Sequence, residues 1–168
     1  MRLIFVIFLI GLSSCNWESV LPDPASTVID VKSQRGWRTT ALDNAYKIQF
    51  PRGYQGGIGP TIEGPEFSLK RYDQQAYFLG IMPFFGGGMP LPNPQPATIP
   101  HGNVLLDRLV TFQRNGQTQG LFYYAQQPKA LGRLYLLHNG TLGYSMIVQY
   151  DYSLHQEVLG ILQTIQPH

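Results

Sequence analysis

Cysteine is nearly absent from this sequence. Cys15 is the only cysteine among the 168 residues. A single cysteine cannot form an internal disulfide, and it supplies neither a Cys-X-X-Cys redox pair nor a zinc site built from several thiolates. Any thiol chemistry of this chain is therefore confined to Cys15.

An excess of charge of either sign is also lacking. Lys and Arg together number 12 and Asp and Glu number 10, which gives a formal net charge of +2. Nucleic-acid-binding proteins carry a basic stripe, and anionic lipid headgroups attract polybasic runs. This sequence has neither pattern, so we expect no nucleic acid partner.

The short motifs of common enzymes and metal sites are missing as well. No serine lies in Gly-X-Ser-X-Gly, and the glycine run at 86–88 matches neither the dinucleotide-binding pattern nor the P-loop. The four histidines show no metal-ligand spacing; they are His101, His138, His155 and His168. We therefore predict no catalytic residue, no metal site and no cofactor.

The most specific feature that is present is the start of the chain. Arg2 precedes an apolar run from Leu3 to Ile10, and Leu12-Ser13-Ser14-Cys15 follows. A basic start, an apolar segment and small residues before a cleavage point are typical of a secretory signal. The run is shorter than the roughly 20 apolar residues of a transmembrane helix. We therefore predict a signal peptide over residues 1–14.

The motif Leu12-Ser13-Ser14-Cys15 resembles the lipobox of bacterial lipoproteins. The resemblance implies that the Cys15 thiol carries diacylglycerol, that the leader is cut just before it, and that the new amino terminus is acylated. Two or more acyl chains anchor a protein stably. Because Asn16 and not Asp follows the cysteine, the resemblance implies an outer-membrane lipoprotein facing the periplasm. The membrane is then a partner through acylated Cys15.

Beyond the cysteine, the chain divides into a tether and one domain. Residues 15–36 contain Pro22 and Pro24 and show little periodicity, apart from a short strand that we consider at Thr27–Val31. Residues 37–168 have the length of a single domain. The glycines and prolines of 85–101 predict an extended connection without helix or ladder pairing.

Alternating polar and apolar residues predict strands through most of the domain. The expected strands are Trp37–Leu42, Ala45–Phe50, Phe67–Tyr72, Ala76–Phe84, Gly120–Gln126, Leu131–His138 and Thr141–Asp151. Asn139-Gly140 indicates a hairpin between the last two. We assign no strand to the glycine-rich stretch at 53–59.

Two segments instead show helical spacing. Apolar residues from Val104 to Phe112 recur every three or four positions, and Asn115-Gly116 fits a helix end. Ser153 fits the cap of a last helix, whose apolar stripe runs to Ile165. The order strands, helix, strands, helix predicts an α+β fold in which two helices flank an antiparallel sheet.

Two segments are similar to the PsbP/DcrB-like group of small α/β sandwich proteins. They are Tyr46-Lys47-Ile48-Gln49-Phe50-Pro51-Arg52-Gly53-Tyr54 and the stretch from Val158 to Ile165. The resemblance implies a curved antiparallel sheet, a long mid-chain connection and a closing C-terminal helix. It supplies no catalytic residues.

Three functions stay open at this point. The first is a non-catalytic envelope lipoprotein that binds a protein partner or supports an assembly, with a surface at Met89, Tyr123 and Tyr124. Tyrosine suits interfaces because it joins an apolar ring to a polar tip, although strand tyrosines also fill cores.

The second function is a small-ligand carrier with a pocket between sheet and helix, under the loop 85–101. The third, and the least supported, is an envelope hydrolase that assembles its site from distant residues, such as His101 with Asp107 or Glu66.

Overall fold

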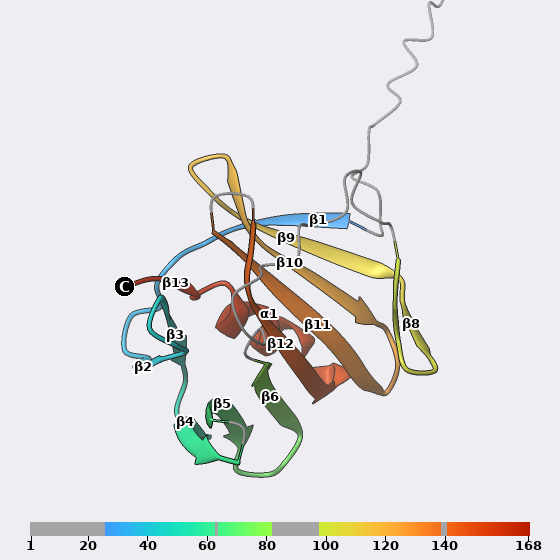
Figure 1. The fold of residues 1–168 in the computed structure, drawn as a ribbon. Coiled ribbons are helices and arrows are strands. Elements are labelled where there is room, and N and C mark those ends of the chain that lie inside the picture. Colours follow the sequence, from blue (N-terminus) through green and yellow to red (C-terminus); the bar gives the residue numbers. More distant parts are fainter. Residues whose placement is uncertain (1–25, 63, 82–97, 139–140) are drawn as a thin grey trace, which may run out of the picture.

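The computed structural model describes residues 26–62, 64–81, 98–138 and 141–168. An eight-stranded sheet dominates this part of the chain (Figure 1). A three-stranded sheet and the helix α1 pack against one of its faces, and a short two-stranded hairpin packs against the other.

The elements follow in chain order. The first half contains β1 (Ser26–Asp30), β2 (Arg38–Ala41), β3 (Tyr46–Phe50), β4 (Tyr54–Thr61), β5 (Gly64–Arg71), β6 (Ala76–Ile81), β7 (Ile99–His101) and β8 (Val104–Leu106). The second half contains β9 (Arg108–Arg114), β10 (Gln117–Ala125), β11 (Lys129–His138), β12 (Thr141–Asp151), the 3₁₀ turn η1 (Tyr152–Leu154), α1 (His155–Leu162) and β13 (Gln166–Pro167).

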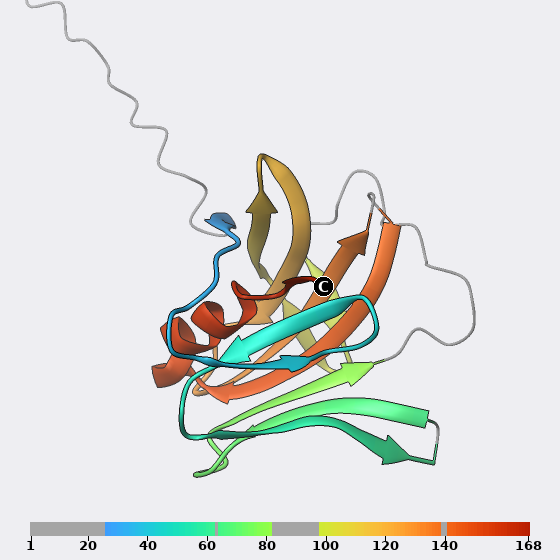
Figure 2. The ribbon, with the colours of Figure 1, turned by 90° about the vertical axis from the view of Figure 1, so that its left-hand side faces the viewer.

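The large sheet is mixed. Its strand order is β1-β9-β10-β11-β12-β6-β5-β4. β1 runs parallel to β9, and all other neighbours in this sheet are antiparallel. The small sheet has the order β13-β3-β2, and Figure 2 shows it with α1 against the large sheet.

The main core lies between the large sheet and the layer formed by α1 and the small sheet. Strand β12 shows how alternation builds it, because Tyr144, Met146, Val148 and Tyr150 are all buried on one face. α1 contributes its buried residues Val158, Leu159, Ile161 and Leu162 to the same core. The space between sheet and helix is thus filled by side chains.

A second, smaller core lies on the other face, where the β7–β8 hairpin covers β10. Leu106, Leu121, Tyr123 and Ala125 are buried there. The middle of the sheet is therefore covered on both faces. On the face that carries the hairpin, β12, β6 and β5 have half-buried side chains, such as Ile147, Leu79 and Ser68.

The predicted fold class is wrong. The protein is mostly β with one short helix in the described residues, and not a sheet flanked by two helices. The segment predicted as the first helix forms β8 and β9, in which Val110 and Phe112 are buried and alternate with Leu109 and Thr111. Branched and aromatic side chains favour such a pleated surface, and the short apolar run fits either period.

Asn115-Gly116 does not end a helix but turns the chain from β9 into β10. Both residues have positive φ, 52° for Asn115 and 75° for Gly116. Positive φ at both central positions is the mark of the type I′ hairpin turn, which Asn-Gly favours.

The C-terminal helix is present, but its predicted cap is wrong. α1 starts at His155, and no side chain caps its first residue. Ser153 lies in η1, where Asp151 is the capping residue: its carboxylate accepts hydrogen bonds from the Ser153 backbone at 2.9 Å and hydroxyl at 2.6 Å.

Strands β4, β7 and β13 were not predicted, and β13 is a two-residue strand after α1. β4 runs through the glycine-rich stretch, where a Cβ on Gly56 would lie 2.0 Å from the carbonyl oxygen of Ser68 on β5, so glycine permits this close pairing. β7 contains Pro100, inside the connection for which no ladder pairing was expected, and it pairs with β8. The strand considered in the tether exists as β1, in register with β9.

Several predicted features lie outside the described residues. They are the signal peptide, Cys15, Met89 and the turn Asn139-Gly140. In the described part of the chain, no helix has the length and apolarity needed to cross a membrane.

Candidate functional site

A groove lies at one end of the large sheet, where β6 and β11 begin and β12 ends. Its volume is about 570 Å³, within the range of about 300–1,000 Å³ that is usual for ligand sites. The lining residues are Gln74, Gln75, Tyr77, Val104, Gln127, Lys129, Ala130, Leu131, Gln149, Tyr150 and Asp151. We call it the glutamine groove.

Glutamine amides form the polar part of this lining. Gln74 and Gln75 come from the β5–β6 turn, Gln127 from the β10–β11 turn and Gln149 from β12. All four side chains are exposed. Each amide offers an oxygen acceptor and two N–H donors, so the groove can meet donors and acceptors alike.

The two charged residues of the groove lie side by side. Lys129 and Asp151 are register partners at the adjoining ends of β11 and β12. Hydrogen bonds from Ser153 hold the pKa of Asp151 below its usual value, and the charge of Lys129 adds to this effect. Asp151 is therefore ionised at neutral pH, beside a cation that offsets its charge.

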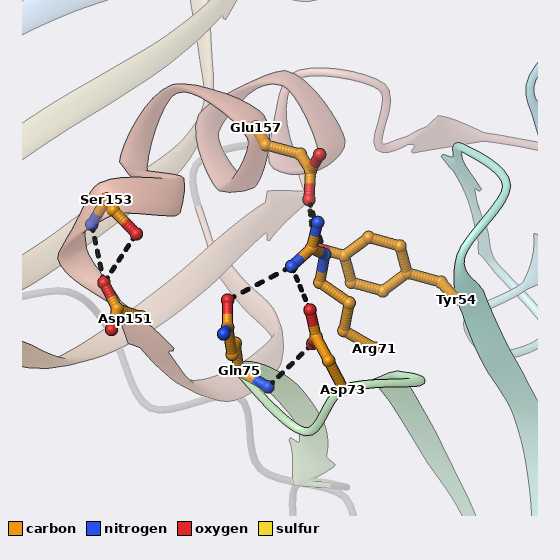
Figure 3. Close-up of polar contacts among 7 residues, drawn as sticks. All are labelled: Tyr54, Arg71, Asp73, Gln75, Asp151, Ser153 and Glu157. Carbon is orange, nitrogen blue, oxygen red and sulfur yellow. Dashed lines mark hydrogen bonds and ion pairs between the residues drawn. The ribbon is translucent and has the colours of Figure 1, made fainter.

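An ion-pair network fixes the part of the groove wall that contains Gln75 (Figure 3). Arg71, at the end of β5, donates to Asp73 and, at 3.3 Å, to Oε1 of Gln75. Its Nε lies 3.2 Å from Oε1 of Glu157 on α1. The Arg71 and Glu157 side chains are 26% and 33% exposed, so water screens this pair only in part.

The same carboxylate binds a core tyrosine. The hydroxyl of Tyr54 donates to Oε1 of Glu157 at 2.7 Å. Burial, and then this hydrogen bond, raise the pKa of Tyr54 far above its usual value. Glu157 thus joins α1, β4 and the end of β5 at one point.

Hydrogen bonds also hold the backbone of the β5–β6 turn. The Gln75 N–H donates to Oδ1 of Asp73 at 3.0 Å, and the Gln75 carbonyl accepts from the Asp151 N–H at 2.8 Å. Gln74 takes the left-handed conformation, with φ of 64°, and donates its N–H to the carbonyl of Arg71. The groove wall is therefore ordered without a ligand.

Behind the groove, an aromatic cluster packs around the first residue of α1. The ring of His155 lies 4.7 Å from Tyr124 and 4.8 Å from Tyr152, measured between centroids. Its Nδ1 lies 2.9 Å from the hydroxyl of Tyr150, a lining residue of the groove. Burial lowers the pKa of His155 below the ordinary 6.5.

This cluster makes stability depend on pH. As pH falls through about 6.5, the unfolded chain takes up a proton on His155 before the folded chain does, so the free energy of unfolding falls with pH. Urea unfolding of the wild type and of His155→Phe at pH 7.5 and 5.5 measures the effect. We expect a smaller pH dependence in the variant, since the other histidines are common to both; equal dependence contradicts the assignment.

A second groove, of about 410 Å³, adjoins the same β10–β11 turn. Leu105, Asp107, Arg108, Ala125, Gln126 and Gln127 line it. Gln127 therefore contributes to both grooves. This second groove mixes opposite charges with an exposed leucine.

The structure separates the candidate partner residues Tyr123 and Tyr124. Tyr123 is 2% exposed in the smaller core, and Tyr124 is half-buried beside His155 on the opposite face. Tyr123 therefore offers almost no surface to a partner, because the β7–β8 hairpin covers it.

The residues suggested for a hydrolytic site come from separate places. His101 is in β7, Asp107 lines the second groove, and Glu66 is in β5. In the described residues, no group of three or more His, Cys, Asp or Glu side chains is placed to hold a metal ion.

Comparison with known proteins gives one structural neighbour. The fold is similar to that of cyanobacterial PsbP (CyanoP) from Synechocystis sp. PCC 6803, known from a solution structure. The similarity covers 82% of this chain and 99% of that chain, with a TM-score of 0.45 and 10% sequence identity. The similarity concerns the fold alone.

Sequence comparison adds no relative. No protein-family model matches this chain, and no curated protein sequence does. The lipobox resemblance therefore stays a prediction that rests on residues 12–15.

No pattern in the sequence predicted the glutamine groove. Its amides are far apart along the chain and follow no periodic pattern. The clearest local signal was Asp73-Gln74-Gln75, whose Asp73 side chain accepts from the Gln75 N–H as an Asx turn does. That signal predicts a turn but no ligand.

Proposed function

We propose that this protein is a non-catalytic binding module of the bacterial cell envelope, with the glutamine groove as its ligand site. The observation that carries the proposal is the placement of four exposed amides from three elements around one groove. Among them, the Gln75 amide is held in place by Arg71, and a group that is positioned before binding loses less conformational entropy.

The ionisable groups of the groove favour binding over catalysis. A general acid or base works best with a pKa near the operating pH. Asp151 is the one carboxylate of the lining, and its lowered pKa keeps it an anion that accepts hydrogen bonds from Ser153. Lys129 opposite it supplies a counter-charge.

The envelope location is proposed from the sequence. Acylated Cys15 anchors the chain to the outer membrane in this proposal, and the domain faces the periplasm. Residues 16–25 separate the anchor from β1 and span at most about 35 Å when fully extended. The domain then works close to the membrane surface and within reach of other envelope components.

Nuclear magnetic resonance tests the ligand site. The full chain, isotope-labelled and purified in detergent, is titrated separately with the glycan, peptide and phospholipid fractions of a digested bacterial envelope. We expect one fraction to shift the side-chain amide signals of Gln74, Gln75, Gln127 and Gln149. Gln117, exposed at the start of β10 and outside the groove lining, is the internal control.

If no fraction shifts the groove amides, or if each fraction shifts Gln117 as strongly as the four groove glutamines, the proposed ligand site is wrong.

A further inference from the structure

We propose that the ligand of the glutamine groove is an uncharged glycan chain that carries N-acetylated sugars. This inference rests on the proposed function and names its ligand class. It follows from four properties of the groove: its amides, its apolar floor, its balanced charge and its position in the sheet.

The amides match the chemistry of such a sugar. A sugar hydroxyl both donates and accepts, and an acetamido group has one N–H and one carbonyl. In Gln75 the side-chain oxygen already accepts from Arg71. Its NH₂ group keeps hydrogens for an acceptor in the ligand, such as an acetamido carbonyl.

Apolar groups supply the second kind of contact that a sugar ring needs. Tyr77, Val104 and Leu131 line the groove and are half-buried, so each keeps part of its surface accessible. Tyr77 and Leu131 are both register partners of Gln149, on β6 and β11, and so lie on the same face of the sheet. The C–H face of a pyranose packs on such a floor while its hydroxyls reach the amides.

The charges of the groove disfavour ionic ligands. Lys129 and Asp151 are the two charged lining residues, and they lie opposite one another. A phosphate or a carboxylate entering the groove meets the Asp151 anion as well as Lys129, and an ammonium group meets Lys129 as well as Asp151. A neutral ligand is repelled by neither charge.

The position of the groove in the sheet disfavours an extended peptide. Peptides that add to a sheet bind the free backbone groups of an edge strand. The lining residues of β6, β11 and β12 belong to interior strands that are paired on both sides, and Val104 is the one lining residue on an edge strand, β8 of the short hairpin. The Gln75 backbone is also occupied, by Asp73 and Asp151. Side-chain amides are therefore the principal polar groups on offer.

Calorimetry and nuclear magnetic resonance with defined probes test this inference on the full chain in detergent. The probes are tetra-N-acetylchitotetraose, cellotetraose, which lacks the acetamido groups, and an uncharged capped peptide of serine and glycine. We expect chitotetraose to bind and to shift the groove amides, and the other two probes to bind at least tenfold more weakly.

Two variants with a matched control locate the site. Gln127→Leu and Gln149→Leu remove exposed amides from the groove, and Gln117→Leu removes an exposed amide outside it, at the start of β10. Losing one or two hydrogen bonds weakens binding by roughly tenfold. We expect that loss in both groove variants and unchanged affinity in the control.

The outcomes separate the two proposals. Peptide binding in the groove without chitotetraose binding overturns the glycan and leaves the ligand site standing. Equal affinity for cellotetraose overturns the role of the acetamido group. If chitotetraose binds but the two groove variants do not weaken it, the sugar site is elsewhere and the glycan inference fails, whereas the ligand site stands or falls with the titration of the envelope fractions.

Discussion

Replacing Cys15 by alanine is expected to abolish fatty-acid labelling of the protein and to remove its acyl anchor, which leaves the uncleaved leader as its remaining contact with the membrane. The acyl chains need the thiol, and this chain has no other cysteine that could take them. Each buried CH₂ of an acyl chain contributes about 0.8 kcal/mol to membrane binding, so losing several chains removes the anchor entirely. Metabolic labelling with a radioactive fatty acid, followed by membrane fractionation, measures both effects.

The matched control for this experiment is Ser14→Ala. It keeps a small residue beside the predicted cleavage point and retains the thiol, so label and membrane association should both persist. The lipoprotein proposal fails if label and membrane association both survive in Cys15→Ala. An unlabelled variant that stays with membranes through its uncleaved apolar leader does not contradict it.

Five strands of the large sheet, β5, β6, β10, β11 and β12, were predictable because their pattern is local. β12 occupies Thr141–Asp151, as alternation in the sequence predicts, and its even-numbered residues from Tyr144 to Tyr150 are buried. β8 and β9 were not, because a short apolar segment fits a helix as well as a strand until its partners are known. β9 pairs with β10 and with the distant β1, and that context decides its conformation.

The candidate site depends still more on distant contacts. Gln75 and Gln149 come together only because β6 pairs with β12 and because the Asp151 N–H reaches the Gln75 carbonyl. Exposed glutamines carry no signal of their own in a sequence, since most are solvated surface residues. Successive residues of a strand point to opposite faces, as Tyr123 and Tyr124 do, but alternation alone does not show that both faces are covered there.

The last prediction concerns a glycine in the centre of the sheet. Gly132, on β11, leaves room for the ring of Phe122: a Cβ at this position would lie 2.4 Å from two atoms of that ring. Phe122 is fully buried and stacks on Tyr124 at 5.6 Å, and Tyr124 in turn contacts His155. The sheet and the start of α1 are therefore connected through a continuous set of rings.

Gly132→Ala is expected to lower the free energy of unfolding by about 1–3 kcal/mol, the usual cost of overpacking a core. The added methyl pushes Phe122 toward Tyr124, and rigid neighbours on both sides leave the ring little room to move. Urea unfolding of the full chain, followed by aromatic fluorescence, measures the loss. Gly59→Ala on the edge strand β4 is the control, because a Cβ there meets nothing within 4 Å.

A double variant distinguishes a clash with this ring from a general intolerance of β11. Phe122→Leu alone removes buried apolar surface and destabilises the protein. Combined with Gly132→Ala, it also removes the clashing ring atoms, so the double variant should be more stable than the sum of the single effects by about 1 kcal/mol or more. Additive effects would show that Phe122 is not what excludes a side chain from position 132, and that the ring stack does not couple the sheet to α1 there.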